Sequence, residues 1–278
     1  MPVRRTRSVH EDDPHDHDRG LAFDVSTLMS RRRALQLLAV GGLAALVGCG
    51  STSAQGDAAA TATTESAAGS PVSEVPEETA GPYPADGSNG VDVLGQSGIV
   101  RSDITSSFGS ASGTAAGGPL AIALTVVDVS AGGAPAEGAA VYLWHCDRDG
   151  RYSMYDSAIA EENYLRGVQV AGADGAVTFA SIFPAAYSGR WPHIHFEVYP
   201  SVDEATSGGS KLVTSQIALP QDACETVYAT SGYEQSVANL AQTSLETDMV
   251  FSDGYSTQLG TVTGDPDAGM AVALNVGV

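Results

Sequence analysis

The sequence predicts an all-β fold, an antiparallel β-sandwich with few short helices, and three observations support it. Short segments rich in β-branched and aromatic residues recur through the C-terminal two hundred residues. Clusters of Gly, Pro, Asp and Ser separate them, as in Ala171-Gly172-Ala173-Asp174-Gly175. Helical patterns are confined to residues 222–229 and 236–247.

The strands can be placed by their two-residue alternation. In residues 139–145, Val141 and Leu143 alternate with Tyr142 and Trp144, so the two pairs face opposite sides of a strand. No glycine-rich phosphate loop follows any such segment, which argues against a nucleotide-dependent enzyme. The expected strands are residues 120–129, 139–145, 176–182, 193–199, 211–219 and 271–278.

The N-terminal part has the pattern of an export signal followed by a tether. Ser30-Arg31-Arg32-Arg33 precedes a short apolar run from Leu37 to Val47, the pattern of a twin-arginine signal segment. Leu46-Val47-Gly48-Cys49 resembles a lipobox, so Cys49 is the expected lipidation site; a buried helix with a chance Cys is the alternative. We therefore expect a signal segment at 1–49, a flexible Ser/Thr/Ala/Gly tether at 50–75 and one folded β-sandwich domain at 76–278.

The charge distribution excludes some partners. Beyond residue 49 the chain has six basic and 27 acidic residues, a net charge of about −21. Such a surface repels nucleic acid phosphates and anionic lipid headgroups. We therefore expect no nucleic acid partner and membrane attachment only through Cys49, with the protein exported and anchored outside the cytoplasm. Strong acidity is also typical of proteins adapted to high salt and of soluble secreted proteins.

Two further cysteines, Cys146 and Cys224, lie in the expected domain. An even pair outside the cytoplasm suggests a disulfide. Two separate buried thiols are the alternative.

Two histidines are the first candidate metal ligands. His193 and His195 flank Ile194 in an expected strand, so both rings project from one face. Two adjacent imidazoles can hold a metal. The spacing alone equally fits a polar sheet face.

Two tyrosines could complete that site. Tyr187 lies in a loop with two Pro and a Gly that leads directly into the histidine strand, and Tyr152 follows a turn after segment 139–145. A free phenol has a pKa of about 10 and ionises at neutral pH only beside a strong positive charge. Iron(III) suits two phenolates and two neutral imidazoles. Zinc more often takes Cys, His or carboxylate ligands, and iron(II) oxygenases use two His and a carboxylate.

Several motifs together resemble a known family. The motifs are Gly150-Arg151-Tyr152, Tyr164-Leu165-Arg166-Gly167-Val168-Gln169, Phe183-Pro184-Ala185-Ala186-Tyr187 and Arg190-Trp191-Pro192-His193-Ile194-His195-Phe196, with Thr79-Ala80-Gly81-Pro82-Tyr83 nearer the N-terminus. They resemble the intradiol ring-cleavage dioxygenases, the group of protocatechuate 3,4-dioxygenase and catechol 1,2-dioxygenase.

The resemblance implies a function and roles for residues. It implies that Fe(III) is bound by Tyr152, Tyr187, His193 and His195, and that Tyr187 dissociates when substrate chelates the metal. It implies that Arg190 stabilises negative charge on the substrate; the alternative for Arg190 is a surface ion pair. One departure is that the family often has Pro where this chain has Trp191.

The expected activity is O2-dependent cleavage of a catechol-type ring to a muconate-type diacid. Two alternatives stay open from the residues alone. One is a non-catalytic β-sandwich surface lipoprotein that serves as a binding module. The other is a zinc or copper hydrolase built on the histidine pair.

Overall fold

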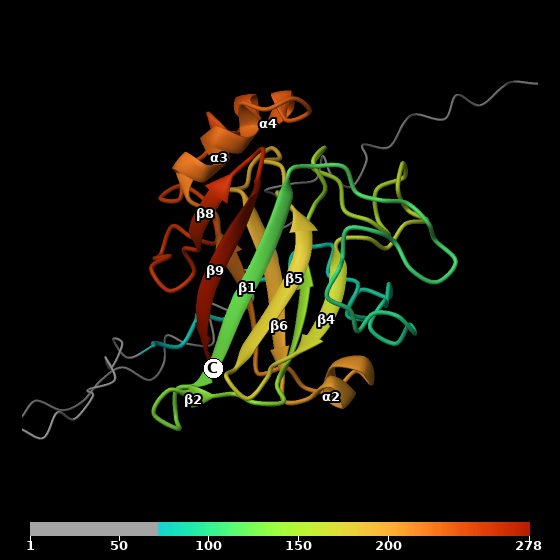
Figure 1. Ribbon diagram of the computed structural model, residues 1–278, viewed down its shortest axis with the longest axis vertical. Coiled ribbons are helices and arrows are strands. Elements are labelled where there is room, and N and C mark those ends of the chain that lie inside the picture. Colours follow the sequence, from blue (N-terminus) through green and yellow to red (C-terminus); the bar gives the residue numbers. More distant parts are fainter. Residues whose placement is uncertain (1–71) are drawn as a thin grey trace, which may run out of the picture.

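The computed structural model describes residues 72–278, and these form two β-sheets packed face to face (Figure 1). Residues 1–71, which include Cys49 and the expected signal segment and tether, lie outside the described part. The strands are β1 (Pro119–Asp128), β2 (Ala134–Pro135), β3 (Ala140–Trp144), β4 (Arg166–Val170), β5 (Ala176–Ile182), β6 (His193–Tyr199), β7 (Val213–Ala218), β8 (Thr261–Asp265) and β9 (Gly269–Gly277).

The first sheet has the order β2-β1-β9-β8, with β5 also paired to β1. The second sheet has the order β4-β3-β6-β7 and is antiparallel throughout. The predicted all-β sandwich is therefore confirmed. One strand pair differs from the expected antiparallel pattern, because β1 and β9 run parallel.

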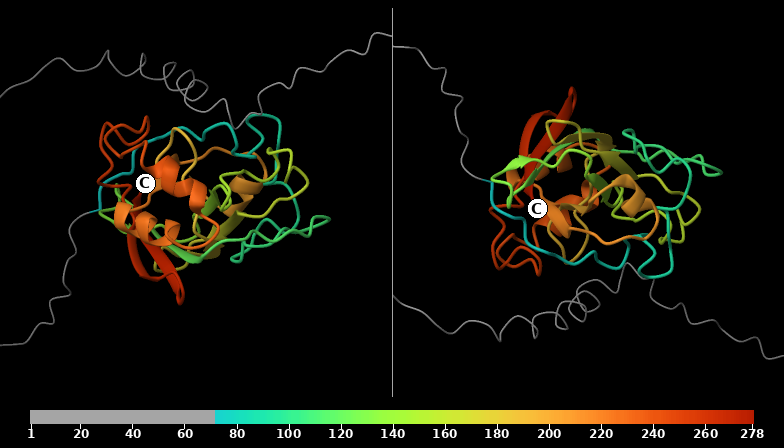
Figure 2. Two further views of the ribbon diagram at one scale, coloured as in Figure 1. Left: turned by 90° about the horizontal axis from the view of Figure 1, so that it is seen from above. Right: turned by 90° about the horizontal axis from the view of Figure 1, so that it is seen from below.

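Within residues 72–278, three short helices lie at the ends of the sandwich. Helices α3 (Gln221–Tyr228) and α4 (Glu234–Leu240) cover one end and α2 (Val202–Thr206) lies at the other (Figures 1 and 2). The helix expected at 222–229 is α3, and the one expected at 236–247 begins earlier and ends at Leu240. None of the helices between residues 72 and 278 is both long and apolar enough to cross a bilayer.

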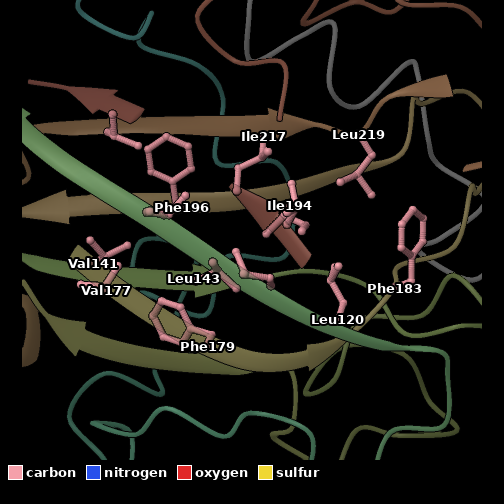
Figure 3. Packing of buried hydrophobic residues seen from close by; sticks show 14 of the residues in the cluster. Leu120, Val141, Leu143, Val177, Phe179, Phe183, Ile194, Phe196, Ile217 and Leu219 are labelled. Carbon is pink, nitrogen blue, oxygen red and sulfur yellow. The ribbon is translucent and has the colours of Figure 1, made fainter. Parts of the chain in front are cut away.

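The core lies between the sheets because alternate side chains of each strand point inward. Leu120 of β1, Phe179 of β5, Leu143 of β3 and Phe196 of β6 meet there (Figure 3). Burying each such side chain contributes roughly 1.5–3 kcal/mol. The expected strands all occur with small shifts in their ends, whereas β2, β4 and β8 were missed. Strand β8 is nearly fully exposed and has a Gly in its sequence, so it lacks an apolar alternation.

The outer face of the second sheet is also covered. Segments from residues 79–99 and 146–165 pack over it and form a second apolar cluster that includes Tyr142, Trp144 and Tyr152. As a result, β6 is buried on both faces. The covered outer face carries His193 and His195.

The expected disulfide between Cys146 and Cys224 is not present, because both thiols are free and buried. Cys146 packs in the cluster on the outer face of the second sheet, whereas Cys224 belongs to the core between the sheets. The Cys146 thiol faces the carbonyl oxygen of Ala185 at 3.7 Å. Burial raises the pKa of both thiols, so each behaves as a small apolar side chain.

Candidate metal centre

Three donor atoms converge on the outer face of β6. The Nε2 atoms of His193 and His195 are 3.1 Å apart, and the Tyr187 hydroxyl lies 3.2 Å from His193 Nε2. Ligand atoms about 2.1 Å from one metal ion are roughly 3 Å apart when they bind at right angles. The spacing is therefore that of neighbouring ligands on a single ion.

Both imidazoles are in the form that metals bind. The Nδ1–H of His193 donates to the carbonyl oxygen of Trp191, so its Nε2 keeps a lone pair toward Tyr187. Burial and the Arg190 guanidinium lower the pKa of His193. Burial and neighbouring His193 lower the pKa of His195 well below 6.5. Both rings are therefore neutral at neutral pH, and protons do not compete with a cation.

A tight turn after β3 places Tyr152. The Asp147 carboxylate accepts hydrogen bonds from the backbone N–H groups of Asp149 and Arg151. Gly150 has φ +83°, and a Cβ atom there would lie 3.1 Å from the Cβ of Tyr187. Only glycine meets both demands without strain. The Gly150-Arg151-Tyr152 motif thus brings the two tyrosines to the same place.

The Tyr152 hydroxyl is buried and has no hydrogen-bond partner of acceptable geometry among residues 72–278. Its ring centre lies 6.1 Å from those of both Tyr187 and His195. Burial, followed by the neighbouring Tyr187, raises the pKa of Tyr152 well above 10. A buried unpaired hydroxyl is costly, and ionisation at neutral pH would need a cation beside it.

The loop that carries Tyr187 is held by the helices at the end of the sandwich. The hydroxyls of Tyr228 and Tyr233 donate to the carbonyl oxygens of Pro184 and Phe183. Asn239 of α4 donates to the carbonyl oxygen of Ala186. Tyr187 itself is only partly buried, whereas Tyr152, His193 and His195 are buried.

Arg190 lies in a buried ion pair rather than in the surface pair considered from the sequence. Its Nε donates to Asp248 Oδ2 at 2.9 Å, and both side chains are almost fully buried. A terminal nitrogen of the guanidinium also donates to Gln216 Oε1 at 2.8 Å and to Asp248 Oδ1 at 3.3 Å. Gln216 lies opposite His195 in the β6–β7 register, so this network is attached to the histidine strand.

Trp191, which stands where the resembled family often has Pro, takes part in the same network. Its backbone N–H donates to Asp248 Oδ2 at 2.7 Å, and its indole N–H donates to the carbonyl oxygen of Leu219 at 2.8 Å. Proline has no N–H and could not make the first bond. A residue with a backbone N–H at position 191 therefore allows the hydrogen bond to the Asp248 carboxylate.

The structure brings together the four side chains that were expected to bind a metal, and it adds contacts of residues that the sequence did not single out. The Asp248 carboxylate accepts hydrogen bonds from the backbone N–H groups of Val250 and Phe251, as a turn residue does. Its ion pair with Arg190 spans 58 positions and leaves no local signal. Gln216 falls in an expected strand, and its contact with Arg190 depends on the register of that strand with the histidine strand.

The donor set fits a hard trivalent cation. Within residues 72–278, no group of three or more His, Cys, Asp or Glu side chains is placed to hold a metal. The further donors beside the histidine pair are the two tyrosines, one of them buried without a partner. Two phenolates with two neutral imidazoles suit iron(III), which stabilises the ionised phenol.

Comparison with known proteins assigns the family. A family model described as Dioxygenase matches residues 100–252, more than half of the chain. The chain belongs to the intradiol ring-cleavage dioxygenases. An intradiol ring-cleavage dioxygenase from Tetranychus urticae has a similar structure, with a TM-score of 0.57 and 26% identity over 74% of this chain and 94% of that chain.

Two curated dioxygenases match over shorter segments. Chlorocatechol 1,2-dioxygenase of Rhodococcus opacus is 40% identical over 55 residues, which cover 20% of this chain and 21% of that protein. Catechol 1,2-dioxygenase 1 of Acinetobacter lwoffii is 39% identical over 71 residues, 25% of this chain and 22% of that protein. The chain thus spans about a fifth of the length of the curated relatives that it matches.

The Arg190–Asp248 pair gives a stability prediction. Asp248→Ala leaves a buried guanidinium without its carboxylate, and breaking a buried pair costs about 3–5 kcal/mol. We expect a loss of that size in the free energy of unfolding, measured by urea denaturation at pH 7. Asp267→Ala removes the same charge from an exposed turn and should change stability by less than about 0.5 kcal/mol. Equal losses in the two variants would contradict the prediction.

The same pair sets a pH dependence. Burial raises the pKa of Asp248, but Arg190 and the hydrogen bonds it receives outweigh this, so its pKa lies below 3.8. A carboxyl whose pKa is lower in the folded state stabilises the fold above its unfolded pKa. We expect this stabilisation to be complete above about pH 4 and to be lost at lower pH. Unfolding measured from pH 7 down to pH 3 should therefore show a smaller loss of stability in Asp248→Asn than in the unchanged protein.

Proposed function

We propose that this dioxygenase cleaves the ring of a catechol-type substrate with O2 at a mononuclear iron(III) site, giving a muconate-type dicarboxylic acid. One observation carries the proposal. The two histidine Nε2 atoms and the Tyr187 hydroxyl converge beside the buried, partnerless hydroxyl of Tyr152. When bound, iron(III) would supply a Lewis acid that holds both catechol oxygens and draws electron density from the ring, so that the ring meets O2.

The four candidate ligands differ in burial, and this suggests different roles. His193, His195 and Tyr152 are buried and form the fixed part of the site. Tyr187 is partly buried on a loop, next to exposed Ser188 and Gly189, so it has room to move aside for the substrate. Once released, its phenolate oxygen can accept a proton from a catechol hydroxyl.

Arg190 would offset negative charge that develops on the bound ring. Asp248 and Gln216 fix the direction of its guanidinium. Because Asp248 already balances its charge, Arg190 orients hydrogen-bond donors more than it adds net positive charge to the site. This balance, together with the net charge of about −21 beyond residue 49, favours uncharged catechols over carboxylated ones.

The iron proposal predicts colour. Purified protein loaded with iron(III) should show a visible tyrosinate-to-iron charge-transfer band and take up O2 with catechols. Tyr152→Phe should weaken and shift the band and lose turnover, because it removes one of the two phenolate ligands and leaves Tyr187. Tyr155→Phe removes the same hydroxyl from a tyrosine whose partners are Asn89 and the backbone of Ala85, and it should keep the band.

The two alternatives predict other results. A protein that stays colourless and free of iron after loading would support a non-catalytic binding module. Zinc or copper in metal analysis, with Tyr152→Phe retaining metal and activity, would support a hydrolase built on the histidine pair.

The charge argument predicts substrate preference. We expect kcat/KM for methyl 3,4-dihydroxybenzoate to exceed that for 3,4-dihydroxybenzoate, which has similar bulk but a negative charge. The gap should narrow as salt rises from about 10 mM to about 150 mM, because the Debye length shrinks from roughly 30 Å to roughly 8 Å. Faster turnover of the carboxylate, or a gap that salt does not change, would contradict this preference. Oxygen uptake measures both substrates directly.

We also propose that the protein is exported by the twin-arginine route and anchored outside the cytoplasm by a lipid on Cys49. The Arg31-Arg32-Arg33 run, the short apolar segment and the Leu46-Val47-Gly48-Cys49 pattern support this. Cys49→Ala should block lipid processing or release the protein from membranes, as assessed by fractionation. Cys224→Ala, at a buried thiol, is the matched control and should leave fractionation unchanged. Unchanged membrane association of Cys49→Ala would refute the anchor.

A further inference from the structure

The two histidines of the site are held in different ways. His193 donates from Nδ1 to a backbone carbonyl, whereas the Nδ1 of His195 is buried and has no hydrogen-bond partner within residues 72–278. Histidines that bind metals almost always donate their second ring N–H to a carboxylate, carbonyl or water, which fixes the ring. No protein group between residues 72 and 278 makes this bond to His195, so the side chains and backbone packed around the ring are what the protein itself offers to orient it.

A stacked indole provides that contact. Trp144 of β3 lies directly opposite His195 of β6 in the strand register. The two rings are almost parallel, with an interplanar angle of 6° and centroids 4.8 Å apart. Trp144 is fully buried, so the indole cannot turn away into solvent.

The stack is anchored on its far side. Tyr142, two residues before Trp144 on the same face, stacks with the indole at 4.9 Å and 20°. Its hydroxyl donates to the carbonyl oxygen of Pro84 and accepts from the Arg166 guanidinium. The column Tyr142–Trp144–His195 is therefore tied to two further segments of the chain.

The edge of the His195 ring is bounded as well. A Cβ atom at Gly81 would lie 3.4 Å from His195 Cε1, so the backbone of the covering segment passes close to the ring. With the indole on its face and this backbone at its edge, the ring has little freedom to rotate.

We propose that Trp144 is a positioning residue for His195, and that aromatic stacking replaces the hydrogen bond that orients His193. The inference rests on the proposed role of His195 as an iron ligand.

The test compares two truncations of Trp144. Trp144→Phe keeps an aromatic face, whereas Trp144→Leu removes it. For each iron-loaded protein, the rate of iron loss to a chelator and the position of the visible band are measured. We expect Trp144→Phe to stay within about threefold of the unchanged protein, and Trp144→Leu to lose iron roughly 10–100-fold faster with a shifted band. Phe196→Leu truncates the opposite face of the same sheet, and should lower Tm without changing either readout.

A second readout needs neither iron nor a folded Trp144→Leu variant. In metal-free protein, the ring current of Trp144 should shift the His195 ring protons upfield in the NMR spectrum, and Trp144→Phe should reduce this shift without abolishing it. Unshifted His195 protons, or equal iron loss from Trp144→Phe and Trp144→Leu, would overturn the role of Trp144. In either case the protein without substitutions would still bind iron and show the visible band, so only the role of Trp144 would be refuted. If the protein without substitutions stays colourless after iron loading, the proposed function itself is contradicted.

Discussion

Strand β6 is buried on both faces, and the position of the site follows from this constraint. Ile194, Phe196 and Val198 enter the core between the sheets, so the two-residue period turns His193 and His195 to the other side. A shift of one residue in the pairing of β6 would exchange the two sets and place imidazoles in the apolar core. The packing that stabilises the sandwich therefore also fixes the direction of the two rings, and the register with β3 and β7 brings Trp144 and Gln216 beside them.

Irregular segments cover the outer face of this sheet, and the buried backbone N–H and C=O groups of these segments need hydrogen-bond partners. Arg166 provides several, because its guanidinium donates to the carbonyl oxygens of Tyr83, Pro84 and Ser153. Lys211 joins the buried Glu197 carboxylate of β6 to Asp86 of the covering segment. These contacts press residues 81–86 onto the sheet, where Gly81 approaches His195 and the Tyr83 ring packs 5.0 Å from that of Tyr152. The polar contacts of Arg166 and Lys211 thus hold residues 81–86 beside the candidate metal ligands His195 and Tyr152.

The fold and the histidine pair could be predicted because alternation along a strand is a local property. Tyr152 required the resemblance to a family, since its turn brings it to the site only through Asp147 and Gly150. Asp248 and Gln216 were out of reach because their contacts depend on how distant segments pack. The prediction of a disulfide between Cys146 and Cys224 was wrong for the same reason. The number of cysteines does not show that the two thiols belong to different apolar clusters.

The donors are held in place by contacts that involve no metal. The Asp147 turn places Tyr152, the Trp191 carbonyl orients His193, and the Trp144 indole stacks on His195. Among residues 72–278 the buried Tyr152 hydroxyl has no hydrogen-bond partner of acceptable geometry, and leaving a hydroxyl in that state costs about 1–3 kcal/mol. A cation that the phenolate could bind would remove that cost, and a ligand that binds only the folded state stabilises it. The buried phenol therefore links metal binding to the stability of the sandwich, whereas Arg190, already balanced by Asp248, is in place before any ligand arrives.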